Sequence, residues 1–552
     1  MLDTVLDWIL RGVVIAFGAG ALIALARWVR AALRERRERW AIRLALAMLL
    51  LSLVYAWGHA RLLWQAEELE AGRMAWRRFG DPREAERNRA ELRGWIHDCT
   101  GEDANALARY GMRDGEVQRI YPLGEAGANL VGGGANADER DYTVERLFAR
   151  QLRAPRHFGE QGELHPLGTD MRLTLCAAPT REAWRLLQAT GRDGAVIIQD
   201  VQTGAIVAYA ATGRPEDPPF GIKRYSPPGS VFKLAVAALW WDSGLPDTRM
   251  PCPPYIQTGN ARIRNFESHE YESITIPTGM LTVSCNTAAV RMALEMRQQL
   301  GTDAFRDAYT RFGFLAYSEG LPSTQDEPFW NTENGAWQER MTPPAVRVRF
   351  APRFTAHEWG QISIGQGPVD ATPLGISRFI QAIGNNGVML PPTLEWEQLE
   401  KRGEGRRLMK ESTSLKLQQA MLTVVDTGTA QVAKARLVGT GWDLGGKTGT
   451  ADVANAPAPD GWFAGLMYGP DKRARYSVVV YLRRGGQGGR DPARIAGEMT
   501  RWMSRSPQII TPGAGETPRQ ESAARPGTAP RDVAVRQDEA ARSAAPVRNG
   551  GR

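Results

Sequence analysis

The clearest indication of the fold is the stretch GAVIIQDVQTGAIVAYAA, residues 194–211. Its two apolar runs, Gly194–Asp200 and Ala205–Ala211, are rich in Val, Ile and Ala, and the turn-forming residues Gln202–Gly204 separate them. Short apolar runs that are bounded by turn residues are typical of buried strands. The stretch therefore predicts two strands that are joined by a tight turn.

The sequence around this stretch adds helices and further strands. An apolar run at Val231–Trp241 predicts a buried helix, and the runs GWFAGLMY (461–468) and YSVVVYL (476–482) predict two more strands. A helix is predicted at about Pro492–Met503. Together these elements indicate a mixed α+β domain over residues 170–506, which is long enough to bury a large core.

Composition limits the class of protein. The chain has 552 residues, of which 43% are hydrophobic and 24% are charged. At roughly 100–200 residues per domain, this length predicts two to four domains. The balance excludes a wholly disordered, collagen-like or many-pass membrane protein. The net charge of +8 suggests nucleic acid or a membrane surface as an anionic partner. Because the sequence contains no nucleic-acid-binding motif, no nucleic-acid partner is predicted.

Two apolar runs, Gly12–Ala26 and Leu44–Trp57, predict a two-helix transmembrane anchor over residues 1–59. Each run approaches the ~20 residues that cross a bilayer, if flanking arginines extend to the headgroups. Seven arginines lie within residues 27–43, and such loops stay in the cytoplasm. The chain after Trp57 is therefore predicted to be extracytoplasmic, at the bacterial inner membrane. The alternative is a cleaved signal peptide followed by a soluble amphipathic helix.

The other segments have less distinctive patterns. Residues 60–169 are predicted to form a membrane-proximal helix and one small domain, and the Pro/Ala/Arg-rich tail, residues 507–552, is predicted to be disordered. The histidines are scattered, so neither a metal nor a cofactor is predicted. Three cysteines could be free or paired (Cys99, Cys176 and Cys252), and Cys285 is interpreted as a buried free thiol.

The first chemical motif is Ser230-Val-Phe-Lys233, which opens the apolar helix. A spacing of three residues places both side chains on one helical face. A buried, neutral amine can take the proton of a serine hydroxyl and so activate it as a nucleophile. Taken alone, the pattern is better explained by a helix-capping serine beside a lysine that reaches solvent, because it is common by chance.

Two further motifs follow in order, Ser284-Cys285-Asn286 and Lys447-Thr448-Gly449-Thr450. A hydroxyl and a carboxamide on one turn can relay a proton and bind a peptide amide. A cation, two hydroxyls and a glycine on an edge strand can receive a ligand backbone. Each motif alone could be a helix cap or an exposed turn. The ordered triple is the signature of penicillin-binding proteins and class A β-lactamases, although Cys285 replaces an aspartate.

On these residues the sequence resembles the class B, monofunctional penicillin-binding proteins, the D,D-transpeptidases that cross-link peptidoglycan. The resemblance covers about Tyr121–Met503. It implies an antiparallel sheet packed with helices, plus a helical subdomain, over residues 170–506, after a small pedestal domain within residues 60–169. Further landmarks of the family are Ile364–Gly367, Thr372–Leu374, Gly428–Ala430 and Asp460–Gly465.

The resemblance also implies roles for the motif residues. Ser230 attacks the carbonyl of the penultimate D-alanine of a stem peptide, with Lys233 as its general base. Ser284 relays a proton to the leaving amine with help from Lys447, and Asn286 binds the substrate amide. The substrate carboxylate is received by the third motif, at Thr448, Gly449 and Thr450. Implied partners are nascent glycan strands, β-lactams as inhibitors, and a membrane glycan polymerase.

Other functions compete with this interpretation. A catalytically silent scaffold of the cell-wall machinery would not need the intact motif residues. A β-lactamase would need a second carboxylate for deacylation, and a β-lactam sensor would need a cytoplasmic output domain; the sequence indicates neither. The stretch 317–355 fits the family poorly and is either a long loop beside the site or a variable surface insertion.

Overall fold

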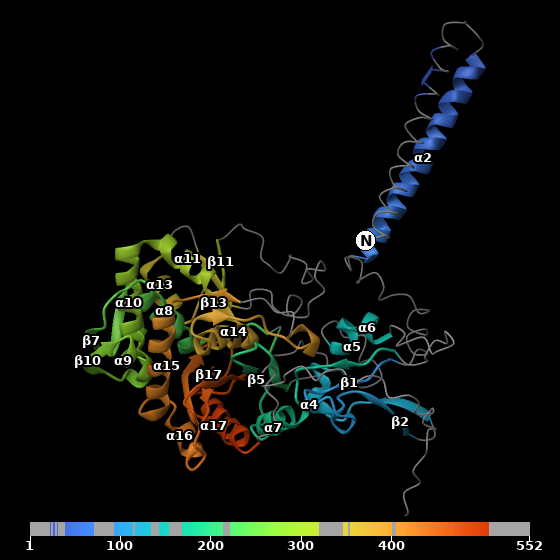
Figure 1. The fold of residues 1–552 in the computed structure, drawn as a ribbon. Coiled ribbons are helices and arrows are strands. Elements are labelled where there is room, and N and C mark those ends of the chain that lie inside the picture. Colours follow the sequence, from blue (N-terminus) through green and yellow to red (C-terminus); the bar gives the residue numbers. More distant parts are fainter. Residues whose placement is uncertain are drawn as a thin grey trace, which may run out of the picture. The chain divides into compact units, whose positions relative to one another are not determined.

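We analysed a computed structural model of the chain (Figure 1). It describes single positions between residues 23 and 30 and the ranges 39–70, 93–113, 116–133, 143–153, 168–212, 221–222, 224–318, 346–350, 354–399 and 405–506. The chain divides into two compact units, residues 1–512 and 513–552. The second unit, and the whole of the tail predicted to be disordered (residues 507–552), lie outside the described residues.

The centre of the fold is a five-stranded antiparallel sheet in the order β16-β17-β18-β5-β6. Its strands are β16 (Asp443–Ala451), β17 (Asp460–Tyr468), β18 (Ala474–Leu482), β5 (Gly194–Asp200) and β6 (Ile206–Ala211). The four strands predicted from the apolar runs are confirmed. The two predicted strand pairs meet where β18 pairs with β5, and β16 forms one edge of the sheet.

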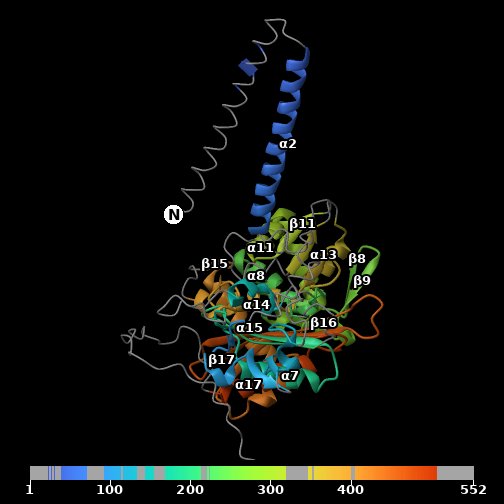
Figure 2. The ribbon, with the colours of Figure 1, turned by 90° about the vertical axis from the view of Figure 1, so that its right-hand side faces the viewer.

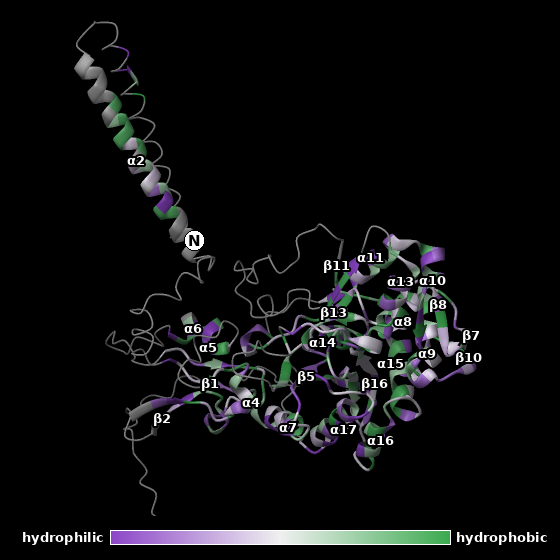
Figure 3. Cartoon of the chain, turned by 180° about the vertical axis from the view of Figure 1, so that it is seen from behind, coloured by the Kyte–Doolittle hydropathy of each residue, from purple (hydrophilic) through white to green (hydrophobic). Residues whose placement is uncertain are grey.

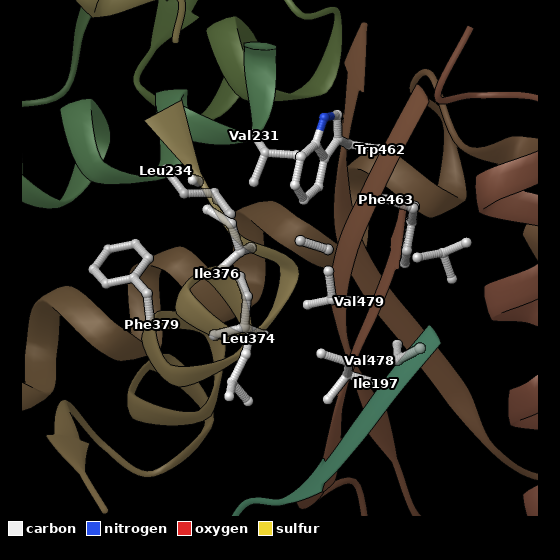
Figure 4. Close-up of a cluster of buried hydrophobic side chains, with 14 of the residues drawn as sticks. Ile197, Val231, Leu234, Leu374, Ile376, Phe379, Trp462, Phe463, Val478 and Val479 are labelled. Atoms are coloured by element: carbon white, nitrogen blue, oxygen red, sulfur yellow. The ribbon is translucent and has the colours of Figure 1, made fainter. Parts of the chain in front are cut away.

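Helices cover both faces of the sheet, so β5 and β17 are buried along their whole length. On one face α14 (Pro373–Gly384) packs against β5, β17 and β18. On the other lie α7 (Ala177–Gln188) and α17 (Asp491–Ser504), as Figures 1 and 2 show. Leu374 and Ile376 of α14 meet Val479 of the sheet in this core (Figure 4). Burial on both faces explains why these strands read as continuous apolar runs.

A second group of helices packs beside β16. Its central member is α8 (Lys233–Asp242), which is buried from Lys233 to Trp241. A helix that is apolar on every side belongs in the interior. The predicted helix at 231–241 is therefore confirmed, except that it begins with the 3₁₀ turn η3 (Gly229–Phe232). Around it lie α9 (Thr278–Thr282), α10 (Asn286–Leu300), α11 (Thr302–Arg311) and α15 (Glu411–Asp426), and α13 (Ala356–Ser363) packs on α10.

The region before the sheet contains short elements. Strands β2 (Arg109–Arg113) and β3 (Glu116–Ile120) form a hairpin, and β1 (Ile96–His97) pairs in parallel with β4 (Met171–Arg172). The short helices are α4 (Glu125–Ala128), α5 (Val144–Leu147) and α6 (Ala149–Arg153). Glu145 is fully buried and pairs with Arg93 and Arg119 at 2.8 and 2.7 Å. This ion cluster joins α5 to β3, through Arg119, and to the residues just before β1, through Arg93.

The long helix α2 (Arg39–Glu70) includes the second apolar run. Several of its large apolar side chains are exposed, and Figure 3 shows its hydrophobic residues in green. Within the described residues, no helix has both the length and the apolar character needed to cross a membrane. The transmembrane helix predicted at 44–57 thus finds no support. The first predicted span lies almost wholly outside the described residues.

The stretch 317–355, which fits the family poorly, is described only near its ends. Strand β11 (Leu315–Ser318) enters it, and β12 (Val346–Phe350) lies near its far end. These two strands pair in parallel, and β12 pairs with β13 (Val369–Ala371). Both ends are therefore anchored in one small sheet, whatever the role of the residues between them.

All four cysteines form disulfides, Cys99–Cys176 and Cys252–Cys285. The interpretation of Cys285 as a free thiol is wrong. The fold brings the end of β7 (Thr248–Cys252) to the start of α10, with 6.3 Å between the two Cα atoms, which suits a disulfide. Cys285 is buried as expected, but its partner lies 33 residues away in the sequence.

Candidate active site

The turn that carries Ser230 is pressed against the edge strand β16. Gly229 has a φ of +53°, and a Cβ atom there would lie 2.5 Å from the carbonyl oxygen of Thr450. A Cβ at Gly449 would lie 2.5 Å from the carbonyl oxygen of Pro228. Only glycine allows both close approaches. These two glycines therefore let Ser230 lie directly beside the third motif.

Ser230 and Lys233 are three residues apart across η3 and the first residue of α8. In a 3₁₀ turn, side chains at i and i+3 are eclipsed, so both side chains leave the turn on one side. Ser230 is half-buried and lines the cleft, whereas Lys233 is fully buried. The hydroxyl is thus open to a ligand and the amine is shielded from water.

The second motif forms a turn between α9 and α10. Ser284 has a φ of +57°, an uncommon conformation for serine, and its carbonyl oxygen accepts a 2.6 Å hydrogen bond from Lys233 Nζ. Lys233 Nζ also donates to Asn286 Oδ1 at 2.7 Å and to Ser284 Oγ at 3.3 Å. Lys447 Nζ donates to Ser284 Oγ at 2.9 Å. The Ser284 hydroxyl therefore bridges the two lysines.

The strand β16 presents its motif in two directions. Lys447 is fully buried and reaches Ser284, whereas Thr448 and Thr450 line the cleft. This alternation follows from the two-residue period of a strand. Thr448 Oγ1 lies 2.6 Å from Thr429 Oγ1, and Thr450 Oγ1 accepts from the backbone N–H of Gly488 at 3.3 Å.

Burial controls the charge of both lysines. Desolvation holds the pKa of Lys233 well below its ordinary value, and the neighbouring Lys447 lowers it further. Desolvation also lowers the pKa of Lys447 to about 7. Among the described residues, neither lysine forms an ion pair with a carboxylate. Burial therefore favours the neutral amine, the form that can accept a proton, which an exposed lysine does not supply at neutral pH.

The motif residues line a cleft of about 1140 Å³. The family landmarks at 364–367 and 428–430 contribute Ile364, Gln366, Gly367, Gly428 and Thr429 to its walls. The sequence patterns did not single out Asn265, His269 or His357, which also line the cleft. Their separation along the chain leaves no motif by which to find them. The described residues contain no cluster of His, Cys, Asp and Glu suited to a metal ion.

Taken together, the site has the parts of a serine acyltransferase. It contains an accessible hydroxyl beside a buried amine, a hydroxyl that connects this amine to a second one, and a carboxamide. Its other wall is an edge strand that carries hydroxyl groups. Such a site can form and resolve an ester on Ser230.

Comparison with known proteins agrees with this class. Residues 194–501, more than half of the chain, match the family model described as "Penicillin binding protein transpeptidase domain". The chain belongs to this family. The resemblance to class B penicillin-binding proteins and the α+β transpeptidase fold expected from it are thereby confirmed.

Individual relatives are distant. The "Probable peptidoglycan D,D-transpeptidase PenA" of Neisseria gonorrhoeae is 26% identical over 377 residues, which cover 65% of this chain and 58% of the relative. The "Peptidoglycan D,D-transpeptidase PbpA" of Mycolicibacterium smegmatis is 25% identical over 433 residues, which cover 67% of this chain and 79% of the relative. The chain thus spans 58% of the length of the relatives from Neisseria gonorrhoeae and Neisseria meningitidis.

Solved structures show the same fold. Penicillin-binding protein A from Mycobacterium tuberculosis superposes with a TM-score of 0.60 at 21% identity, over 75% of this chain and 99% of that one. The same protein, solved as a ceftriaxone acyl-enzyme complex, also has a TM-score of 0.60 at 21% identity. That match covers 76% of this chain and 99% of the other.

Proposed function

We propose that this protein is a serine D,D-transpeptidase that cross-links peptidoglycan stem peptides and is acylated by β-lactams. The observation that carries the proposal is the buried amine of Lys233, which bonds to Ser284 and Asn286 on the same cleft as Ser230. The family supports the same activity, and relatives are named as D,D-transpeptidases.

In the first step, Ser230 Oγ attacks the carbonyl carbon of the penultimate D-alanine and Lys233 Nζ accepts the hydroxyl proton. The backbone N–H groups of Ser230 and Thr450 stabilise the oxyanion. The peptide C–N bond then breaks, and the departing D-alanine nitrogen receives a proton through Ser284. The 3.3 and 2.9 Å contacts of Ser284 Oγ with the two lysines support this relay, because each lysine can resupply the hydroxyl.

Substrate binding uses the other groups of the cleft. Asn286 binds the stem-peptide amide, and Thr448, Gly449 and Thr450 receive the terminal carboxylate with Lys447. In the second step, an amine of a neighbouring stem attacks the ester carbonyl, which forms the cross-link and returns the proton to Ser230. A β-lactam enters at the first step but leaves a stable ester, since its leaving nitrogen stays tethered.

We further propose a location outside the cytoplasm with an N-terminal membrane attachment. Disulfides persist in oxidising compartments, and this chain has two. Exposed apolar residues such as Leu50, Leu51 and Trp57 on α2 support attachment over residues 1–59. The pedestal within 60–169, the catalytic domain at 170–506 and a membrane glycan polymerase as partner belong to the same proposal.

Labelling with a fluorescent penicillin tests the activity. The full-length chain, purified in detergent, should form a stable adduct that Ser230→Ala abolishes. The control Ser243→Ala, an exposed serine at the other end of α8, should label like the wild type. Absence of an adduct on the wild type would support the silent scaffold. Rapid loss of label with turnover would support a β-lactamase.

A further inference from the structure

The turn that carries Ser284 and Asn286 is held by contacts that the three motifs do not include. Ser284 keeps a positive φ, which a non-glycine residue retains only when its surroundings determine it. This conformation points the Ser284 carbonyl oxygen at Lys233 Nζ. The structure around the turn must therefore supply the constraint.

One constraint is covalent. Cys285, the middle residue of the motif, is bonded to Cys252 at the end of β7, and both are fully buried. Cys285 is also the N-cap of α10, where its Sγ accepts from the backbone N–H of Ala288. The disulfide thus fixes the residue between Ser284 and Asn286 to a strand on the far side of the turn.

The second constraint is the buried side chain of Asn265. Its Oδ1 accepts from the backbone N–H of Asn286 at 2.8 Å and of Thr287 at 3.2 Å. Its Nδ2 donates to the carbonyl oxygens of Pro253 at 2.8 Å and His269 at 2.9 Å. A single carboxamide therefore connects the first turn of α10 to the segment after β7 and to the rim of the cleft.

These contacts and the disulfide hold the same short motif, Ser284–Asn286. Asn265 Nδ2 approaches Cys252 Sγ at 3.3 Å, and Asn286 Nδ2 donates to the carbonyl oxygen of Arg264 at 2.7 Å. The side chain of Asn286 is oriented by the Arg264 carbonyl on one side and by Lys233 on the other. Release of this support would leave Lys233 without its best-placed acceptors.

We propose that Asn265 and the Cys252–Cys285 disulfide are positioning residues of the reaction, because they hold Ser284 and Asn286 against Lys233. The inference rests on the proposed transpeptidase function and deepens it. A corollary is that full activity requires an oxidising compartment, since the reduced chain lacks the covalent part of this support.

The test compares the two disulfides in the full-length chain. The variant Cys252→Ser/Cys285→Ser loses the bond at the site, and Cys99→Ser/Cys176→Ser loses the bond that joins the segment after β1 to α7. Three quantities are measured for each variant: the rate constant of acylation at saturating fluorescent penicillin, the half-saturating penicillin concentration, and the melting temperature.

Both variants should melt at lower temperature, but only the site variant should be acylated slowly. We expect its rate constant to fall by at least about tenfold, since a misplacement of about 1 Å at the reacting groups can cost about 100-fold and the loosened turn can still sample its native position. Its half-saturating concentration should rise by a smaller factor than the rate constant falls, because only the amide contact of Asn286 is displaced and the carboxylate-binding residues on β16 are untouched. The control should keep its acylation rate within about twofold of the wild type.

A second variant keeps the test decisive if the site variant does not fold. Asn265→Ala should lower the rate constant of acylation by a larger factor than it raises the half-saturating concentration. Asn385→Ala, which removes a carboxamide after α14, should leave both quantities unchanged. Wild-type acylation rates in folded Cys252→Ser/Cys285→Ser or in Asn265→Ala would overturn the inference. Equal losses in both disulfide variants would also overturn it. If the wild type itself forms no adduct, the proposed function fails and the inference falls with it.

Discussion

The substitution Gly229→Ala tests whether the close approach of the Ser230 turn to β16 is needed for acylation. The new Cβ would lie 2.5 Å from the Thr450 carbonyl oxygen and 2.9 Å from its carbon. Relief to an ordinary contact of 3.4 Å requires a movement of about 0.9 Å between the turn and the strand. A movement of that size next to the reacting atom is expected to slow acylation by about 100-fold.

The same substitution should also destabilise the protein. A left-handed conformation costs an L-residue about 1–2 kcal/mol, and overpacking adds about 1–3 kcal/mol. Gly244→Ala is the matched control, because Gly244 also has a positive φ (+77°) but a Cβ there would meet nothing within 4 Å. It should cost only the conformational part and leave acylation unchanged.

The assay is the rate of labelling by fluorescent penicillin, with unfolding of both variants followed in denaturant. The expected result is slow labelling for Gly229→Ala and wild-type labelling for Gly244→Ala. If the two variants were labelled at rates within about threefold of each other, the reasoning from close approach would be refuted.

Three further predictions concern the lysines and the buried ion cluster. Lys233→Arg should abolish acylation, because a guanidinium stays protonated and cannot act as a base, and penicillin labelling would measure the loss. Lys447→Met should move the acid limb of the acylation rate to higher pH. It removes a cation that lowers the pKa of Lys233. Both amines contact Ser284 Oγ, at 3.3 and 2.9 Å, and two charges held this close to one atom repel by about 3 kcal/mol at an effective dielectric constant of about 20. Glu145→Ala should lower the free energy of unfolding by about 3–5 kcal/mol, since it removes the buried carboxylate that pairs with both Arg93 and Arg119. The control Glu182→Ala, on a surface pair whose arginine is exposed, should cost no more than about 1 kcal/mol.

Each of these predictions has a clear contrary outcome. Normal labelling of Lys233→Arg would remove Lys233 as the base. An acid limb that stays in place or moves to lower pH in Lys447→Met would contradict the coupling of the two lysines. Equal losses of stability for Glu145→Ala and Glu182→Ala would show that the buried cluster contributes no more than a surface pair.

Much of the fold could be predicted because its signals are local. The strands β5, β6, β17 and β18 lie within the predicted apolar runs or within one or two residues of them. A strand buried on both faces must be apolar throughout, and this is visible in any short window. The apolar helix α8 was recognisable for the same reason. The three motifs were recognised by their order along the chain.

The arrangement of the site could not be predicted in the same way. Lys233 and Ser284 are 51 residues apart, and Ser284 and Lys447 are 163 residues apart, yet their side chains are hydrogen-bonded. Motif order says that such residues belong together but not which atoms meet. The positive φ of Ser284 and the lowered pKa of Lys233 arise only when surrounding elements exclude water and determine the turn.

The cysteines show the same limit most clearly. Burial of Cys285 was expected from its place inside the second motif, but its pairing with Cys252 depends on where β7 ends relative to α10. Asn265 carried no signal, since one asparagine in a loop is unremarkable until four backbone groups converge on it. The sequence by itself determined which elements form and which chemical groups the chain can offer, because periodicity and motif order act over short distances. Only tertiary packing decided which of these groups touch and how they are charged, because those properties depend on neighbours that are distant in the chain.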